Sequence, residues 1–560
     1  MNPDPALERA LAECAREPIH VIGAVQPPGV LLVARHRDLR VLAASANAVD
    51  LFDAGDMQAL LHQPLDALLD RSAIEAVRAV LARGDAGLSQ FACTTNAGPL
   101  GALHDVSAHL SGELLHLELE PSGRGASLQG GHALVAGLDA AAGVDFLGSV
   151  ARQVQLISGY DRVMVYRFLP DCSGEVVAES LSGDLGSYDG LRYPASDIPP
   201  QARALYLRNR VRVIADVDAE PQPLLQSPEL DDPVDMSFDV LRAASPVHLQ
   251  YLRNMGVRAS MSISLVVDGR LWGLVACHHA VPRPVAARQR VALEMVGRHA
   301  SMILDAQELR SRARADAACR SQRDELERKL HRARDAAALL PDLLELVLGA
   351  VEADGVAISL DGTWHTHGQV PGDEGLAYAL AWAGSQGHAG IAATSQGSAW
   401  HPDPPRAACG LFATPVGQGR GDWLLLFRRE QVQNLRWAGR PDQPFQIDDN
   451  GLRIGPRVSF EAWKEEVHGT STPWNERDFE STQRLCMVLE RYVSGRRPRI
   501  AGVDPDAPMR RWDAREQATR LRRLAELLDG ASPDRKRLQR MQALLAHMED
   551  ELGALADTPG

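Results

Sequence analysis

The sequence is short of aromatic residues, and it lacks paired cysteines and long apolar runs. The last two absences each exclude a class of protein. Its seven cysteines are scattered without a Cys-x-x-Cys pair, which excludes a disulfide framework and a cysteine-rich zinc site. No stretch approaches the roughly 20 apolar residues of a membrane span. The first apolar run, residues 19–33, contains Pro27 and Pro28 and does not look like a signal peptide. We therefore expect a cytoplasmic protein.

Basic residues are also in deficit. The chain has 59 lysines and arginines against 73 acidic residues, a formal net charge of −14. Because this charge repels nucleic acids and anionic membranes, we expect neither as a partner. The sequence also lacks a Gly-x-Ser-x-Gly motif, a P-loop and a His-Glu-x-x-His motif. The residues therefore favour ligand binding over catalysis, and we do not expect an enzyme.

The length indicates several domains of one fold class. At 560 residues the chain is too long for a single core. Strand-like and helix-like patterns alternate in three successive blocks, which predicts an α+β fold for each of them. A Gly/Ser-rich stretch at residues 123–131 separates the first two blocks. We place the domains at residues 1–125, 135–310 and 311–505, followed by a short helical segment at 511–560.

The same patterns predict individual elements in the first two blocks. The expected helices are residues 60–69, 73–83, 144–158 and 196–209, the last of which opens on Ser-Asp-Ile-Pro-Pro. The expected strands include residues 103–109, 114–119, 162–169 and 175–180. Residues 258–267 and 271–278 are expected to pair around the turn Asp268-Gly269.

Long segments in the second half of the chain suggest a connection between domains and the formation of a dimer. A helical pattern runs from about residue 286 to 339 and predicts a spine between domains. A Gly/Pro-bearing excursion follows at Gln431–Arg457, and loops of that length are usually functional or mobile. The helix expected at residues 534–555 carries a heptad seam of leucine and methionine. We expect a homodimer through the spine and the C-terminal helices; the alternative is packing of these helices on their own domain.

Residues 242–262 give the clearest indication of function. This segment contains three arginines, three serines, a histidine and a tyrosine within an apolar framework. A large flat ligand with acidic side arms needs such a mixture, because arginines pair with carboxylates and aromatic rings cover flat faces. The middle block also holds most of the chain's tyrosines. For any single tyrosine, ordinary core packing explains its presence equally well.

Several motifs resemble those of bacteriophytochromes, photoreceptors with PAS, GAF and PHY domains. The GAF-like segments are 161–168, 193–206, 242–262 and 271–279; the PAS-like start is 19–29, and Pro-Arg-x-Ser-Phe at 456–460 resembles the PHY-domain tongue. Two positions depart from family patterns. Val247 stands where plant and cyanobacterial phytochromes carry the cysteine that bonds their bilin, and Gln26-Pro-Pro-Gly29 lacks a usual histidine.

The resemblance implies a ligand and a role for each pocket residue. Cys14 would form a thioether to ring A of biliverdin IXα, a linear tetrapyrrole, and Val247 agrees with an attachment site elsewhere. Arg212 and Arg242 would pair with the two propionates. The other expected pocket residues are Tyr166, Tyr188, Tyr193, Asp197, Ile198, Pro199, Tyr206, Ser245, His248, Tyr251, Ser260, Ser262 and His278.

Within that set, the resemblance implies a role for each group of residues. Ser245, Ser260 and Ser262 would add hydroxyl donors for the propionates; His248 would lie near the pyrrole nitrogens and His278 near the ring D carbonyl. Tyr166, Tyr193 and Tyr251 would line the space in which ring D rotates. Asp197 would face the pyrrole nitrogens through its carbonyl and pair with Arg457 of the tongue, residues 431–460, where Trp437 and Ser459 also take part in signalling. The alternative for Asp197 is an interaction with its own helix.

The resulting hypothesis is a red/far-red photoreceptor that isomerises its bilin, refolds the tongue and signals through its dimer or a separate partner protein. About 50 residues follow the third domain, too few for a kinase ATPase domain. Two alternatives stay open. In the first, the chain is the photosensory part of a longer light-regulated histidine kinase. In the second, it is a pigment-free GAF-type sensor of a small ligand.

Overall fold

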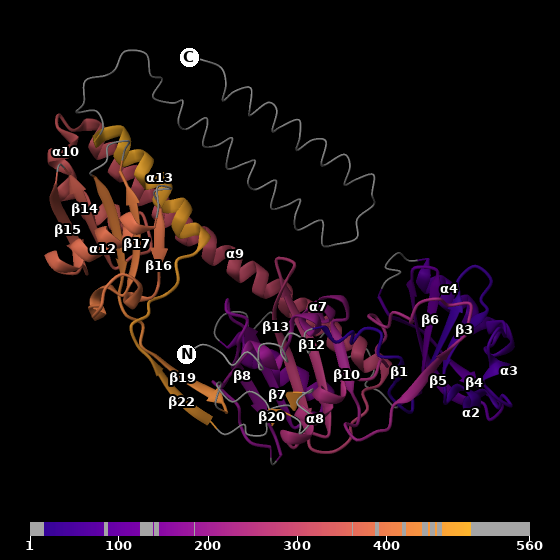
Figure 1. Cartoon of the computed structure of the whole chain (residues 1–560). Coiled ribbons are helices and arrows are strands. Elements are labelled where there is room, and N and C mark those ends of the chain that lie inside the picture. Colours follow the sequence, from indigo (N-terminus) through magenta and orange to yellow (C-terminus); the bar gives the residue numbers. More distant parts are fainter. Residues whose placement is uncertain are drawn as a thin grey trace. The chain divides into compact units, whose positions relative to one another are not determined.

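The computed structural model divides into two compact units, each considered by itself (Figure 1). One unit combines Met1–Asp316 with Gln431–His468, and the other combines Ala317–Glu430 with Gly469–Gly560. Among the described residues, no helix is both long and apolar enough to cross a membrane. The structure describes residues 16–82, 88–123, 138, 145–183, 185–360, 362–386, 391–416, 422–439, 446–447, 454–455 and 462–493.

The first domain is built on a seven-stranded sheet in the order β1-β11-β3-β2-β6-β5-β4. One of its faces packs against α4 (Arg71–Leu81), whose Ile74 and Val77 are buried. The remaining helices of the domain are α2 (Ala48–Phe52), α3 (Met57–Leu60) and η1 (Leu65–Ala67). Its strands are β1 (Ala24–Val25), β2 (Val30–Arg35), β3 (Val41–Ser45), β4 (Gln90–Ala97), β5 (Ala102–Ser111), β6 (Leu114–Pro121) and β11 (Gln222–Gln226).

Two features of this domain differ from expectation. The single helix expected at residues 60–69 is wrong: the chain leaves α3 at Leu61, and η1 begins after Pro64. The residue before a proline is pushed out of the helical region, which explains the break. Strand β11 lies in the second block of the sequence but pairs with β1 and β3 of the first sheet.

The second domain is built on an eight-stranded sheet in the order β10-β12-β13-β7-β8-β9-β19-β22. The expected pairing around Asp268-Gly269 is confirmed, since both turn residues have the positive φ that such a two-residue turn requires. Its strands are β7 (Arg162–Phe168), β8 (Gly174–Leu181), β9 (Arg192–Tyr193), β10 (Val211–Ile214), β12 (Ala259–Val267), β13 (Arg270–His279), β19 (Gln433–Ala438) and β22 (Ala462–Val467).

The two faces of the second sheet differ in composition. Side chains alternate between faces along a strand. Met261 and Ile263 point into an apolar core formed with α6 (Phe146–Ser158) and the start of α9. Their neighbours Ser260 and Ser262 point the other way, toward η3 (Ala195–Asp197), α7 (Pro200–Arg208) and α8 (Pro246–Asn254), where the polar and aromatic residues gather.

Two helix boundaries also correct the sequence-based expectations. The helix expected at 196–209 begins at Pro200, because a short 3₁₀ turn, η3, and two prolines precede it. The expected spine is α9 (Ala287–Arg332), which stops before residue 339. A separate helix, α10 (Ala336–Leu339), follows, and its start is capped by the Asp335 carboxylate, which accepts a hydrogen bond from the Ala338 amide.

The third domain has a five-stranded sheet in the order β15-β14-β18-β17-β16. One face packs against α13 (Glu476–Val493) and residues Leu326 and Leu330 of α9, and the other against α12 (Asp373–Ser385) and Trp400. The strands are β14 (Gly355–Leu360), β15 (Thr363–Gly368), β16 (Ala392–Thr394), β17 (Gly410–Pro415) and β18 (Trp423–Arg428).

Candidate functional site: a cationic and aromatic pocket

A pocket opens on the polar face of the second sheet. It lies among η3, α7, α8 and strand β10, and encloses about 1080 Å³ of space, part of which is open to solvent. Nine residues expected from the sequence line it: Asp197, Ile198, Pro199, Tyr206, Arg212, Arg242, Ser245, His248 and Tyr251.

Two arginines form a cationic wall of the pocket. Arg212 donates hydrogen bonds to the carbonyls of Val240, Arg242 and Ala243, so its guanidinium is fixed in place. Arg242 is only 5% exposed and donates to the carbonyl of Ile19 at 2.6 Å. Its Nε has no hydrogen-bond partner among the described residues. Burial lowers the pKa of both arginines, because surroundings that exclude water disfavour the charged form.

The N-terminal segment reaches the same pocket through two residues that were not among the expected site residues. Glu17 and Ile19 are lining residues. Both carboxylate oxygens of Glu17 lie 3.0 Å from the Ser245 hydroxyl, which donates to them. Ser245 is also the residue that precedes α8, so the helix start and the N-terminal segment are joined.

Helix α8 presents a histidine and a tyrosine to the pocket. The rings of His248 and Tyr251 are stacked, with centroids 6.2 Å apart and an interplanar angle of 13°. The Tyr251 hydroxyl donates to Oδ2 of Asp197 at 3.0 Å, which links α8 to η3. Burial, with a smaller effect of nearby Arg212, lowers the pKa of His248 to about 4. The ring is therefore neutral at physiological pH in the ligand-free protein.

A second histidine lies at the end of β13. His278 is 7% exposed, and its Nδ1 accepts a hydrogen bond from Arg162 at 2.9 Å. Arg162 also lies over the ring of Tyr188, 3.9 Å from the centroid. Burial and then the charge of Arg162 lower the pKa of His278 well below its usual value. Arg162 was not among the expected site residues, although it lies inside the quoted 161–168 motif.

An aromatic cluster adjoins this histidine. Tyr166 and Tyr193 have ring centroids 5.9 Å apart, and Tyr188 and Tyr193 are 6.2 Å apart, both in edge-on contact. Ile198 and Tyr206 of the pocket pack against the same cluster. Gly174 is required beside it, because a Cβ there would lie 1.8 Å from the Tyr166 ring. Ser260 and Ser262 lie at the neighbouring sheet positions, opposite His278 and Ala276.

The hairpin of β19 and β22 ends next to the aromatic cluster. Its strand β19 pairs in parallel with β9, where Trp437 lies opposite Arg192. Trp437 is 9% exposed, and Ala438 is fully buried among Tyr166, Tyr193 and their neighbours. The hairpin therefore extends the sheet that carries the pocket. Of the other expected residues, Cys14, Arg457 and Ser459 and the segment 511–560 lie outside the described residues.

Comparison with known proteins identifies this arrangement. Family models match in chain order: a PAS fold over residues 14–122, a GAF domain over 144–304 and a phytochrome region over 319–497. A bacteriophytochrome of Xanthomonas campestris is 35% identical over 500 residues, which cover 85% of this chain and 78% of that protein. The chain belongs to the bacteriophytochrome family.

Other relatives agree with this assignment. Cyanobacterial phytochrome B of a Nostoc species and a bacteriophytochrome of Pseudomonas aeruginosa are each 36% identical over 86% of this chain, which spans 66% of their length. The crystal structure of a bacteriophytochrome from the photosynthetic bacterium R. palustris superimposes with a TM-score of 0.74 at 32% identity, covering 87% of this chain and all of that one. The predicted PAS, GAF and PHY architecture of this bacteriophytochrome is thereby confirmed.

Proposed function

We propose that this bacteriophytochrome is a red/far-red photoreceptor that binds biliverdin IXα covalently. The observation that carries the proposal is the pocket itself: a cationic wall, a neutral histidine and a tyrosine cluster lie along one sheet face. A linear tetrapyrrole has two carboxylates, a flat conjugated body and one ring that rotates. Each of these parts would have a chemically suitable partner in the pocket or in the tyrosine cluster beside it.

The propionates would lie at Arg212 and Arg242. Carbonyls hold the guanidinium of Arg212, which makes it a fixed positive charge, whereas Arg242 keeps a buried Nε without a described partner. A carboxylate entering beside them would offset the cost of burying these two cations. Ser245, Ser260 and Ser262 would add hydroxyl donors. The Ser245 hydroxyl, which donates to the Glu17 carboxylate in this structure, would donate to a propionate instead.

Cys14 is the proposed attachment site. It lies three residues before Glu17, which lines the pocket. Three residues span at most about 11 Å, so the thiol is within reach of a ligand that fills the pocket. Val247 lines the pocket and offers no thiol at the position that other phytochromes use.

Signalling would pass through the hairpin of β19 and β22. Rotation of ring D against Tyr166 and Tyr193 would disturb their packing with Ala438, and the Asp197–Arg457 pair would form or break. A hairpin held by one short parallel pairing with β9 is a suitable two-state element. Refolding of this tongue would then act on α9 and on the helices beyond the third domain.

Assembly as a homodimer agrees with the surface of α9. Met295, Met302 and Leu309 are spaced by seven residues, and 50%, 68% and 67% of their surfaces are exposed. An apolar stripe with this spacing is typical of helices that pair with a second copy. We propose that output reaches a separate, cytoplasmic partner protein through such a dimer, without catalysis by the PAS, GAF and PHY domains.

A pigment assay tests the proposal. Protein produced together with a heme oxygenase should carry a red absorption band that shifts on illumination, and zinc-induced bilin fluorescence should persist after denaturation. Cys14→Ala should lose the fluorescence of the denatured band, while Cys172→Ala, which removes an exposed cysteine of the GAF domain, should keep it. A colourless wild-type protein would instead favour a GAF-type sensor of another small ligand. Bilin retained on denatured Cys14→Ala would place the attachment elsewhere.

A further inference from the structure

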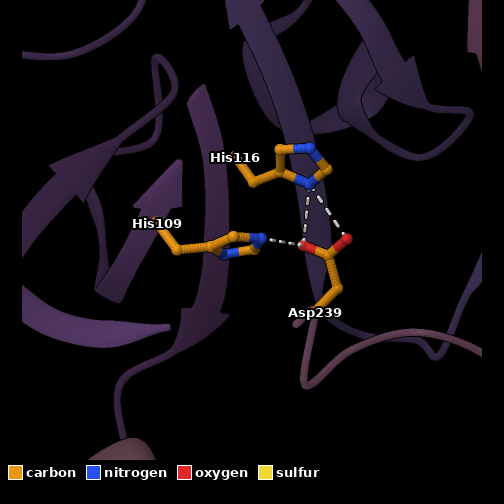
Figure 2. A group of neighbouring side chains, drawn as sticks. All are labelled: His109, His116 and Asp239. Atoms are coloured by element: carbon orange, nitrogen blue, oxygen red, sulfur yellow. Dashed lines mark hydrogen bonds and ion pairs between the residues drawn. The ribbon is translucent and has the colours of Figure 1, made fainter. Parts of the chain in front are cut away.

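A buried cluster of two histidines and an aspartate lies between the PAS sheet and a loop of the GAF domain. His109 of β5 and His116 of β6 are paired directly across the two strands. Asp239 comes from the loop before Arg242, and its carboxylate faces both imidazole rings (Figure 2). All three side chains are fully buried. None of them lines the chromophore pocket.

The loop covers one face of the PAS sheet. Its Val234, Met236 and Leu241 pack against Leu31 and Val33 of β2. His116 and Glu118 lie opposite Val33 and Leu31 on the neighbouring strand, so they share this covered face. The cluster is therefore enclosed by apolar side chains, where polar atoms without partners are costly.

Ring nitrogens in the cluster have unmet bonding capacity. His116 Nδ1 lies 2.9 Å from Oδ2 and 3.1 Å from Oδ1 of Asp239, and His109 Nε2 is 3.9 Å from Oδ1. Neither ring nitrogen of His109 nor Nε2 of His116 has a hydrogen-bond partner in the described part of the chain. A buried polar atom left without a partner costs about 1–3 kcal/mol, so three together need an explanation.

We propose that His109, His116 and Asp239 form a binding site for a divalent transition metal ion of the zinc class. Each offers one ligand atom, and the three atoms lie within 4.8 Å of one another. Two imidazole nitrogens and a carboxylate oxygen suit Zn²⁺, Co²⁺ or Ni²⁺ better than Ca²⁺ or Mg²⁺, which take oxygen ligands.

Metal binding requires a small contraction of the cluster. Ligand atoms around a tetrahedral zinc with bonds of about 2.1 Å lie about 3.4 Å apart. The widest pair of ligand atoms must therefore close by up to about 1.4 Å, and His109 Nε2 must approach Oδ1 of Asp239 from 3.9 Å. The contact of His116 with Asp239, at 2.9 Å, must open slightly. A water molecule or the second Asp239 oxygen would complete the coordination.

Two charged or ionisable side chains near Asp239 would affect metal binding. Glu118 is held by the Leu241 amide at 2.6 Å and the Ser89 hydroxyl at 2.8 Å, so a second carboxyl group sits close to Asp239 without being a ligand. The Arg242 guanidinium also acts on Asp239 and opposes a cation. Any anion beside Arg242 would weaken this repulsion, so the affinity for the metal would depend on what occupies the pocket.

The consequence is a cross-link between two domains. Two ligands come from PAS strands, whereas the third precedes Arg242 by three residues in the GAF sequence. A bound ion would fix the loop that carries Arg242, and with it one wall of the pocket. This inference rests on the geometry of the PAS–GAF junction and does not depend on the identity of the pigment.

The test uses the full chain without pigment, because bilins themselves bind zinc. Protein produced in zinc- or cobalt-supplemented medium and freed of loosely bound metal is analysed by elemental mass spectrometry, and the cobalt form by visible absorption. We expect one ion per chain and cobalt bands of a nitrogen- and oxygen-ligated ion. Wild-type protein that holds no ion after this treatment overturns the proposal.

Variants separate this site from other histidines. His109→Gln and Asp239→Asn should each weaken metal binding by about tenfold or more, whereas His104→Gln, which changes another buried histidine of β5, should not. Circular dichroism verifies that each variant folds; if one does not, the other still gives the comparison. Equal metal content in wild-type, His109→Gln and Asp239→Asn protein would also overturn the proposal.

Discussion

The GAF and PHY sheets are built alike but differ in what covers their second face. In both, one face packs on helices through an apolar core. The second PHY face is sealed, since Leu411, Leu425 and Phe427 pack against α12 and Trp400. On the second GAF face, a buried cluster with Met164 and Leu274 covers only part of the sheet. Beside it, Ser260 and Ser262 lie opposite Ile214 and Arg212, which line a pocket.

This difference can be traced to single strands of the two sheets. All six residues of β14 are buried, whereas burial along β12 alternates for its first five residues. A strand that is apolar on both sides fills its sheet, while a strand with serine at alternate positions leaves room for a ligand. The proposed ligand site therefore lies where the strand carries polar side chains on one face.

The largest expected contrast is in stability. Leu425→Ala, on the sealed PHY face, should lower the free energy of unfolding by about 2–5 kcal/mol, because it removes a fully buried side chain and leaves a cavity. Ser262→Ala, on the open GAF face, should change it by less than about 1 kcal/mol. Thermal or denaturant unfolding of the pigment-free protein measures both.

The pigment assay gives the complementary result. Ser262→Ala should alter the absorption spectrum or the rate of bilin uptake, whereas Leu425→Ala protein that remains folded should bind bilin as the wild type does. Equal losses of stability in the two variants would contradict the distinction between a sealed face and an open one.

The sequence revealed the elements of these sheets better than their connections. Alternation along residues 258–267 and the Asp268-Gly269 turn predicted β12 and β13, because local patterns determine both. Three-dimensional pairing is not local. Nothing around Gln222 indicated that β11 would join the PAS sheet, or that the hairpin ending at Ala438 would extend the GAF sheet.

Site prediction shows the same limit. Motif resemblance located Arg212, His248 and Tyr251, which the structure brings to one pocket. It missed Glu17, whose role depends on where the N-terminal segment crosses the pocket. It also missed the His109–Asp239 cluster, because these residues are 130 positions apart and belong to different domains.

The next largest expected effect is a pH dependence of stability caused by His248 on the open GAF face. The pKa of His248 is lowered to about 4 by burial, and the unfolded chain has its ordinary value near 6.5. The unfolded state therefore binds more protons between these values, so stability is full above about pH 6.5 and falls as the pH drops toward 4. His248→Gln should reduce this loss by about 1–2 kcal/mol, less than the full shift implies because the ring borders the open pocket.

Thermal unfolding midpoints of the pigment-free protein at pH 7.5 and 5 measure the effect. His278 and His109, whose pKa values are also lowered by burial, remain in both proteins, so only the difference between wild type and His248→Gln is informative. His401→Gln in the PHY domain is the matched control for the effect of a histidine-to-glutamine substitution itself. An identical pH dependence in His248→Gln would mean that the ring is already hydrated in the pocket.

The smallest expected effect concerns the hydrogen bond between α8 and η3. Tyr251→Phe removes the hydroxyl that donates to Asp197 and should cost about 0.5–1.5 kcal/mol of stability, since the carboxylate loses a donor at the pocket edge. Tyr378→Phe on α12, where the tyrosine is 39% exposed, should cost close to nothing. If the two variants unfold alike, the polar contacts of the open GAF face contribute no more than a surface tyrosine, and pocket shape would depend on packing alone. A larger loss in Tyr251→Phe would show that the open face is held together by directed polar contacts, where the PHY face relies on apolar burial.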